Sequence, residues 1–241
     1  ELSYPNGGIA QAYQGGAIYW TAATGAHATS GPIRAAWAAQ GFESGKLGYP
    51  VTDEVATANG GRAQAFQGGA IHWTAATGAR TTTGPIRAAW AALGFEGGKL
   101  GYPVTDALSY PNGGLAQAFQ GGSIYWTAAT GAHATSGPIR AAWAAQGFEG
   151  GKLGYPVTDE LSYPNGGLAQ AYQGGSIYWT AATGAHATSG PIRDAWAAQG
   201  FESGRLGYPT TDQYATANGG IAQGFQGGTI SWTSTGGAVI K

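Results

Sequence analysis

Several groups of side chains in this sequence have the residue types of a catalytic site, but each group is incomplete in another copy of the same stretch. His27, Ser30 and Asp53 have the residue types of a nucleophilic triad, in which histidine takes the proton of an attacking serine. In the next copy of the same stretch the histidine and serine positions are Arg80 and Thr83. Arginine stays protonated and cannot act as a base, so we interpret His27 as a surface residue and expect no catalytic group.

Two other chemical patterns fail in the same way. Asp53 and Glu54 could be the acid and base of a glycosidase, but the same step elsewhere reads Asp106-Ala107. The stretch 41–46 is similar to a phosphate-binding loop, but it follows a predicted helix and lacks Ser or Thr after its lysine. The sequence has no cysteine and no His-Glu-x-x-His spacing, so we expect no metal and no cofactor.

One set of charges does recur, namely Arg34, Glu43, Lys46 and Asp53 in its first copy. Such balanced charges are typical of ion pairs that fix loops. The alternative is that the arginine and aspartate make bidentate hydrogen bonds to sugar hydroxyls. On this alternative, the candidate ligand-binding residues are Arg34, Asp53, Arg87, Asp106, Arg140, Asp159, Arg193 and Asp212.

A tandem repeat positions all of these groups. The segment 1–53 returns as 54–106, 107–159 and 160–212 without insertion or deletion, and 213–241 begins a fifth copy. If each repeat is taken to start at its Gly-Pro-Ile step, the chain has a partial repeat and four full ones, which indicates a part of a longer array. The boundaries are then 1–30, 31–83, 84–136, 137–189 and 190–241.

Each repeat contains a predicted β-hairpin. In the first copy, 9–14 and 17–21 are short strands around Gly15-Gly16, with Tyr13 opposite Ile18. We expect Ile9, Tyr13, Ile18 and Trp20 to form the core and the other face to be exposed. The one large side chain on that other face is Tyr19. The residues at the equivalent position in the five successive copies are Tyr19, His72, Tyr125, Tyr178 and Ser231.

Replacement of an aromatic residue by serine would leave a cavity in a packed core, so this position is predicted to be exposed. Tyr19, His72, Tyr125 and Tyr178 therefore join the candidate ligand-binding residues. Trp20 and Trp37 have two interpretations, core packing or a platform on which a sugar stacks, and we favour the core.

A short helix follows the hairpin. Pro32 at the first helical position and Gly41 as terminator predict a helix over 32–40, after a third strand near 27–29. The fold class is therefore β-rich α+β, a tandem repeat in which each unit is a small antiparallel sheet with one short helix. We favour an elongated stalk, with a closed five-bladed propeller as the alternative, and small-angle scattering would separate the two.

Composition limits the partners. Only 10% of residues are charged, compared with about 25% in an average globular protein, and the net charge is −1. No stretch is apolar and long enough to span a membrane, and no repeat has the basic stripe that nucleic acid requires. A neutral partner fits this composition best.

The step Leu47-Gly48-Tyr49-Pro50 resembles the signature of the LGFP repeat family, with Tyr for Phe. The resemblance covers essentially the whole chain. It includes Gly-Pro-Ile at 31–33, Trp37, Gly41 and the stretches 66–73 and 77–78.

This resemblance implies a secreted, actinobacterial module of the cell wall. It implies that the chain binds the peptidoglycan–arabinogalactan wall at several sites and is linked to another domain, such as a mycoloyltransferase or wall hydrolase, which does the catalysis. The alternative function is purely structural, that of a spacer or of a subunit of a surface fibre.

Overall fold

The structure is a computed structural model that describes residues 2–4, 7–110, 112–163 and 165–241. It divides into two compact units, Glu1–Trp126 and Thr127–Lys241. Each unit is described by itself. Within the described ranges, no helix is both long and apolar enough to cross a membrane.

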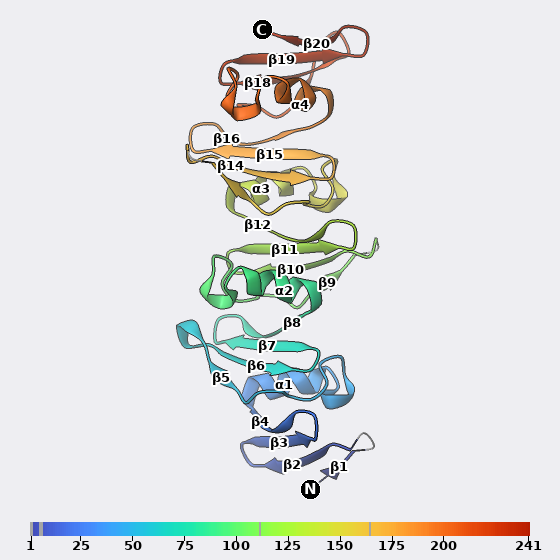
Figure 1. Cartoon of the computed structure of the whole chain (residues 1–241), viewed down its shortest axis with the longest axis vertical. Coiled ribbons are helices and arrows are strands. Elements are labelled where there is room, and N and C mark those ends of the chain that lie inside the picture. The colour runs from blue at the N-terminus through green and yellow to red at the C-terminus, as the bar shows by residue number, and fades with distance from the viewer. Residues whose placement is uncertain (1, 5–6, 111, 164) are drawn as a thin grey trace. The chain divides into compact units, whose positions relative to one another are not determined.

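The same succession of elements recurs along the chain (Figure 1). Four strands are followed by one α-helix and one turn of 3-10 helix, and the last four strands end the chain; a further 3-10 turn at Ala58–Gly60 lies inside the second set of strands. The strands are β1 (Leu2–Ser3), β2 (Ile9–Tyr13), β3 (Gly16–Thr21), β4 (Gly25–Ser30), β5 (Val55–Ala56), β6 (Arg62–Phe66), β7 (Gly69–Thr74), β8 (Gly78–Thr83), β9 (Leu108–Ser109), β10 (Leu115–Phe119), β11 (Gly122–Thr127), β12 (Gly131–Ser136), β13 (Leu161–Ser162), β14 (Leu168–Tyr172), β15 (Gly175–Thr180), β16 (Gly184–Thr188), β17 (Tyr214–Ala215), β18 (Ile221–Phe225), β19 (Gly228–Thr233) and β20 (Gly237–Ile240). The helices are α1 (Gly31–Ala39), α2 (Gly84–Ala92), α3 (Gly137–Ala145) and α4 (Gly190–Ala197), and the 3-10 turns are η1 (Phe42–Ser44), η2 (Ala58–Gly60), η3 (Phe95–Gly97), η4 (Phe148–Gly150) and η5 (Phe201–Ser203).

The strands form antiparallel sheets in chain order, β1-β2-β3-β4 and β5-β6-β7-β8 in the first unit and β13-β14-β15-β16 and β17-β18-β19-β20 in the second. In the first unit β9, β10 and β11 pair in the same way. The predicted hairpin exists, but its turn is one residue earlier than expected, at Gln14-Gly15. Ile18 therefore lies opposite Gln11, and Trp20 lies opposite Ile9.

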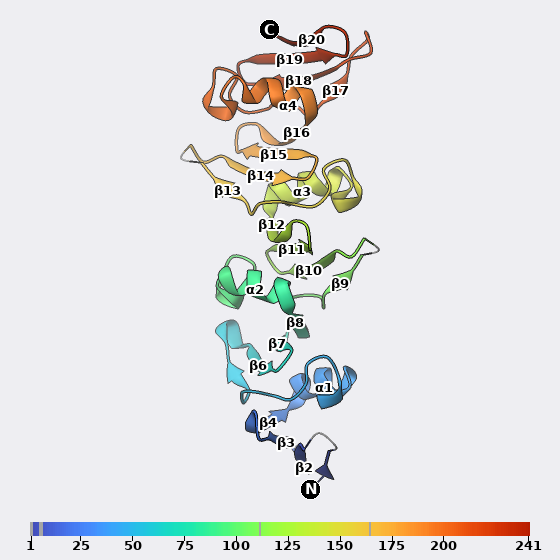
Figure 2. The same ribbon diagram turned by 45° about the vertical axis from the view of Figure 1, so that its right-hand side comes forward.

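The predicted helix is confirmed as α1. Pro32 occupies its first turn, and the chain leaves the helix through Gly41, whose φ of 90° is left-handed. Ile33 and Trp37 lie four residues apart, so they share one face, and both are fully buried. The other helices repeat this pattern, and Figure 2 shows α4 beside β18 and β19.

Each helix packs against two sheets. Around α1, one core contains Tyr19 from the sheet before the helix, Ile33 and Trp37 from the helix itself, and Ile71 from the sheet after it. A sheet between two helices therefore has two buried faces. The expectation that only one face of each hairpin is buried is wrong.

The core assignment for the first copy is also wrong in part. Tyr13, Ile18 and Trp20 are 55%, 38% and 39% exposed, whereas Tyr19 on the opposite face is only 4% exposed. Ile71, the counterpart of Ile18 in the next repeat, is fully buried because α1 covers it. The position is buried wherever a helix precedes the sheet.

The Leu-Gly-Tyr-Pro step joins each helix to the next sheet. The Trp37 indole N–H donates to the Gly48 carbonyl at 3.1 Å, and the backbone N–H of Tyr49 donates to Gln67 Oε1 at 2.9 Å. In return, the backbone N–H groups of Gln67 and Gly68 donate to the Tyr49 and Leu47 carbonyls at 3.0 and 2.8 Å. The step therefore pairs with the hairpin like an added strand.

Replacement of Trp37 by phenylalanine should destabilise the array, because the half-buried Gly48 carbonyl would lose its donor. A buried polar group without a partner costs about 1–3 kcal/mol. Urea unfolding of Trp37→Phe should therefore show a lower free energy of unfolding. Trp20→Phe is the matched control, since Trp20 is 39% exposed and should change stability little. Equal effects of the two changes would contradict this role of the indole.

Candidate ligand-binding site

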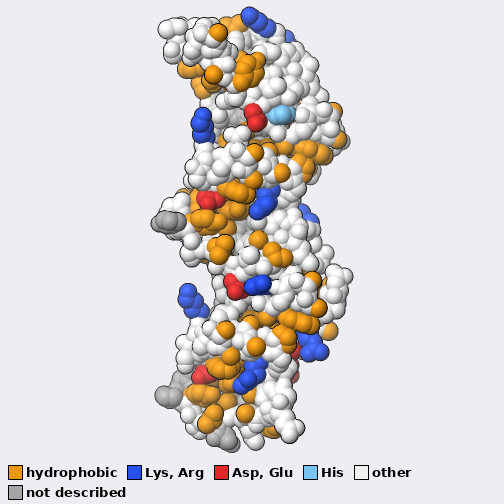
Figure 3. Space-filling view, turned by 180° about the vertical axis from the view of Figure 1, so that it is seen from behind, with side chains coloured by type: hydrophobic (Ala, Val, Ile, Leu, Met, Phe, Trp, Pro, Cys, Tyr) orange, Lys and Arg blue, Asp and Glu red, His pale blue; other side chains and the backbone are white. Residues whose placement is uncertain are grey.

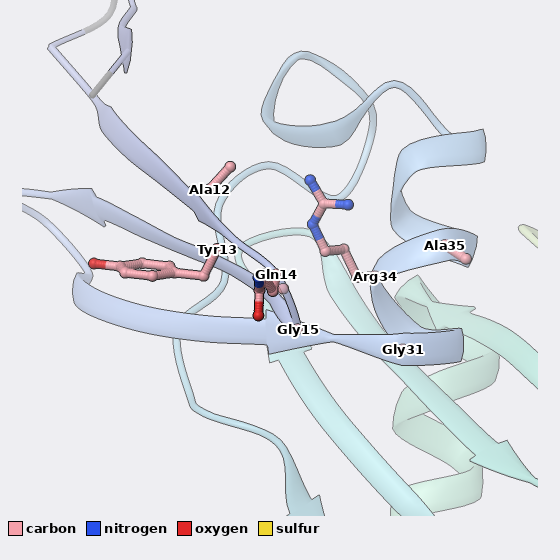
Figure 4. Close-up of a pocket in the computed structure, with 8 residues that line it drawn as sticks. Ala12, Tyr13, Gln14, Gly15, Gly31, Arg34 and Ala35 are labelled. Carbon is pink, nitrogen blue, oxygen red and sulfur yellow. The ribbon is translucent and has the colours of Figure 1, made fainter.

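A cavity that contains an arginine side chain lies beside the first hairpin. Its volume is about 360 Å³, and its walls come from the end of the β2–β3 hairpin and the first turn of α1 (Figure 4). Arg34 lies in the space between hairpin and helix, and Tyr13 points away from it (Figure 4). The lining residues are Ala12, Tyr13, Gln14, Gly15, Gly16, Gly31, Arg34 and Ala35.

The cavity recurs in the next repeat with the equivalent lining. Its volume there is about 410 Å³, and Arg87 takes the place of Arg34. The lining residues are Val51, Ala65, Phe66, Gln67, Gly68, Gly69, Gly84, Arg87 and Ala88, of which all but Val51 have a counterpart 53 positions earlier in the first cavity.

An aromatic ring holds each arginine. The Arg34 guanidinium carbon lies 5.2 Å from the centre of the Phe42 ring, and the corresponding distances are 5.4, 5.3 and 5.4 Å for Arg87, Arg140 and Arg193. Cations are attracted to the face of an aromatic ring at such distances. Phe42 has a φ of 53°, as do its counterparts within 1°, and a phenylalanine in this left-handed region is strained.

The hydrogen-bond state of the arginine differs between repeats. In the first two repeats the Nε atoms of Arg34 and Arg87 are buried and have no hydrogen-bond partner among the described residues. In the fourth, Arg193 Nε donates to Ser176 Oγ at 3.2 Å. The residue equivalent to Ser176 is Ala17 in the first repeat, which has no acceptor atom in its side chain.

The exposed position predicted at Tyr19 is buried instead. Tyr19, His72, Tyr125 and Tyr178 are 4–6% exposed. Tyr19 packs its ring edge-on against Trp37 at 4.6 Å, and Tyr178 meets Trp196 at the same distance. The exposure that made these residues ligand candidates is therefore absent, and the structure places none of them on the walls of the two cavities.

A second substitution accompanies the replacement of tyrosine by His72. Tyr178 stacks against Tyr163, with the ring centres 6.5 Å apart. In the copies that have His72 or Ser231 in place of Tyr19, the position of Tyr4 is occupied by a threonine, Thr57 or Thr216. Thr57 Oγ1 lies 2.7 Å from the Tyr102 hydroxyl, and neither ring nitrogen of His72 has a hydrogen-bond partner among the described residues, so the threonine does not take over a hydrogen bond to the histidine.

The aspartates of the charge set bond to the protein backbone. Asp53 Oδ1 accepts a hydrogen bond from the Ala28 N–H at 2.9 Å and lies 3.5 Å from His27 Nδ1. Asp106, Asp159 and Asp212 accept the corresponding bonds at 2.7, 2.9 and 2.8 Å. These contacts favour the interpretation that the aspartates fix loops, and they lie outside the walls of both arginine cavities.

Of the three groups considered for a triad, His27 and Asp53 lie together, with Nδ1 and Oδ1 3.5 Å apart, but Ser30 is bound to another residue. His27 Nε2 lies 2.8 Å from the Thr24 carbonyl, and Ser30 Oγ donates to Glu54 Oε1 at 2.9 Å. Within the described ranges, no group of three or more His, Cys, Asp or Glu side chains could hold a metal ion. What the site offers chemically is a fixed set of hydrogen-bond donors beside a small cavity.

Comparisons with known proteins identify the repeat. The LGFP repeat family model matches residues 1–45, 47–98, 100–151, 153–204 and 206–240. No curated protein matches the sequence. Solved structures that align include a virginiamycin B lyase from Staphylococcus aureus, at 10% identity over 100% of this chain and 68% of that one, with a TM-score of 0.17. A putative gluconolactonase aligns at 12% identity over 95% and 70%, also with a TM-score of 0.17. Alignments this weak show no shared fold.

Acid should destabilise the second repeat through His72. Burial, and after it the Arg87 charge, lowers the pKa of His72 to about 4, although Glu96 Oε2 lies 3.9 Å from Nδ1. The unfolded chain, with a pKa of about 6.5, binds this proton more readily. Stability should therefore fall as the pH drops from about 6.5 to about 4, by roughly 2–3 kcal/mol.

The measurement is urea unfolding at pH 7 and pH 4.5. His72→Tyr should show a smaller loss of stability on acidification than the parent chain. Tyr19→His should show a larger loss, because it places a histidine in the equivalent buried site. If all three proteins have parallel pH dependence, His72 does not control this acid sensitivity.

Proposed function

Because this chain belongs to the LGFP repeat family, we propose that it is a non-catalytic module that binds neutral polysaccharide of the cell wall through its arginine cavities. LGFP repeats are repeat modules associated with cell-surface proteins and are not a catalytic family. The observation that carries the proposal is the recurrence of one arginine-lined cavity at the repeat spacing.

The cavity has the chemistry that a sugar requires. Volumes of about 360 and 410 Å³ fall within the usual range of small-molecule sites, which is about 300–1,000 Å³. Arginine presents several N–H donors in a rigid plane, and the ring of Phe42 or Phe95 fixes that plane. Two adjacent hydroxyl oxygens of a sugar could each accept one of these hydrogen bonds.

The surrounding surface favours a neutral ligand. Charged side chains in the view of Figure 3 are single or in small groups of mixed sign, separated by uncharged surface. The chain as a whole has a net charge of −1. An anionic polymer would gain little from such a surface, whereas the hydroxyls of arabinogalactan and of the peptidoglycan sugars need no net charge.

Repetition supplies the affinity that one small site lacks. When one repeat is bound, the next site meets the same polymer at a high effective concentration, so weak sites add to a stable attachment. We propose that this attachment holds a secreted actinobacterial protein at the wall, and that another domain of the same protein does the catalysis.

A structural spacer is the second candidate. Its support is that the most characteristic residues of the repeat have structural roles: Trp37 donates to Gly48, and Leu47 is buried under the helix. A spacer would need no ligand in the arginine cavities. The two functions therefore differ in the effect of changing the arginines.

The test is co-sedimentation with purified wall sacculi, with and without Arg34→Lys together with Arg87→Lys. Lysine keeps the positive charge over the ring but loses the planar set of donors. We expect binding to fall by about tenfold or more, which corresponds to about 1.4 kcal/mol. Thermal unfolding of the double variant should stay close to that of the parent.

The matched control is Arg62→Lys, because Arg62 is exposed and contacts Glu54 at 3.4 Å, away from the cavities. Binding should also persist from about 0.1 to about 1 M salt, over which the screening length falls from about 10 to about 3 Å. Binding that is unchanged in the double variant would favour the spacer, and binding lost in salt would point to charge attraction instead.

A further inference from the structure

The buried residue beside the arginine differs between repeats. This residue lies near the start of the second strand of each hairpin, and in the five successive copies it is Ala17, Ala70, Ser123, Ser176 and Thr229. Ala70 and Ser176 are only 2% and 3% exposed. Both belong to sheets that have one helix packed on each side, so the arginine sites of these two repeats can be compared directly.

The arginine has the same position on its ring in the two repeats. The guanidinium carbon of Arg87 lies 5.4 Å from the centre of the Phe95 ring, and Arg193 lies at the same distance from its own ring. Arg193 Nε donates to Ser176 Oγ at 3.2 Å. Ala70 offers no acceptor, and Arg87 Nε is buried without a partner among the described residues. The serine hydroxyl therefore accounts for the difference in hydrogen bonding.

The unpartnered Nε leaves the arginine beside an alanine with more to gain from a ligand. A buried N–H donor without an acceptor is unfavourable, because it has lost its hydrogen bond to water. A ligand hydroxyl that accepts from Arg87 Nε removes this cost, whereas at Arg193 it would first have to displace Ser176. Attraction to the ring face does not depend on how the guanidinium is turned within its own plane. Arg87 can therefore turn its Nε edge toward the cavity and stay on Phe95.

We infer that alanine at this position, as in Ala17 and Ala70, selects the arginine sites that bind a sugar diol, and that Ser176 makes the fourth site a weaker one. The inference rests on the proposed function, because it concerns the ligand of the same cavities. With Nε and a neighbouring Nη both available, the arginine beside an alanine donates one hydrogen bond to each of two adjacent hydroxyl oxygens. The arginine beside Ser176 has only its Nη donors left for a ligand.

The test exchanges the two residue types. Ala17→Ser together with Ala70→Ser should weaken co-sedimentation with purified wall sacculi by about threefold to tenfold, because each arginine then gives its Nε to the new hydroxyl. Ser176→Ala should strengthen it by about twofold or more, because a further diol site becomes available on the same chain. Serine fits at this position, since Ser176 is itself buried.

Thermal unfolding of the same variants should change in the opposite direction to binding. The two added hydroxyls give buried donors a partner, so the Tm of the Ala17→Ser, Ala70→Ser variant should rise or stay the same. Ser176→Ala removes such a partner, so its Tm should fall while its binding increases. Loss of binding together with loss of stability in the double variant would mean that serine disturbs the cavity, and it would overturn the inference.

Periodate treatment of the sacculi tests the class of ligand. Periodate cleaves the carbon–carbon bond between two adjacent hydroxyl-bearing carbons, and borohydride reduction of the resulting aldehydes leaves a neutral polymer. Treated sacculi should bind the parent chain less than untreated sacculi do. The Ala17→Ser, Ala70→Ser variant should show a smaller difference between the two. Equal sensitivity of both chains to the treatment would contradict the assignment of a diol.

Ala56→Ser is the matched control. Ser109 and Ser162 occupy its position in other repeats, and Ala56 lies on the wall of neither cavity, so binding and Tm should not change. If Arg34→Lys with Arg87→Lys leaves binding unchanged, the proposed function fails and this inference fails with it. If that variant weakens binding but the exchanges between alanine and serine have no effect, only this inference fails.

Discussion

The hydrogen bond from a buried tryptophan indole to the glycine carbonyl of the Leu-Gly-Tyr-Pro step is the contact on which each repeat depends. It occurs at 3.1 Å from Trp37 to Gly48, and again from Trp90, Trp143 and Trp196. It requires glycine, since Gly48 has a φ of 64° and a Cβ there would lie 2.5 Å from Gln67 Oε1. With this carbonyl fixed, the next residues can pair with the following hairpin, and one helix can serve as the core for two sheets.

The sequence predicted the elements better than their surroundings. The period, the hairpin and the helix over α1 follow from local signals such as Pro32 and Gly41, which act through the backbone itself. The buried face could not be deduced in this way, because alternation in a strand shows two faces but not what covers each of them. In a sheet that lies between two helices both faces are covered, and Tyr19 and Ile71 lie in the same core on opposite sides of one helix.

The candidate site was only partly predictable for a related reason. Arg34 was identified from its recurrence, but the cavity also depends on Phe42 and on the hairpin end, which are distant from each other in sequence. Tyr19 was misplaced because His72 and Ser231 were interpreted as signs of exposure. His72 meets Trp90 at 4.6 Å as a tyrosine would, and Ser231 lies in the last sheet, where its side chain is half-buried.

Near-identical neighbouring repeats are prone to misfold by exchanging strands with one another. The last strand of each sheet is where such an exchange would begin, because an edge strand has unpaired N–H and C=O groups. In β4 those groups are occupied: Asp53 and Glu54 accept from the N–H groups of Ala28 and Ser30 at 2.9 and 2.7 Å, and Gln64 donates to the Ala28 carbonyl at 2.9 Å. A foreign strand that added here would have to displace two carboxylates. The side chains that order the loop between repeats therefore also oppose the exchange of strands between neighbouring repeats.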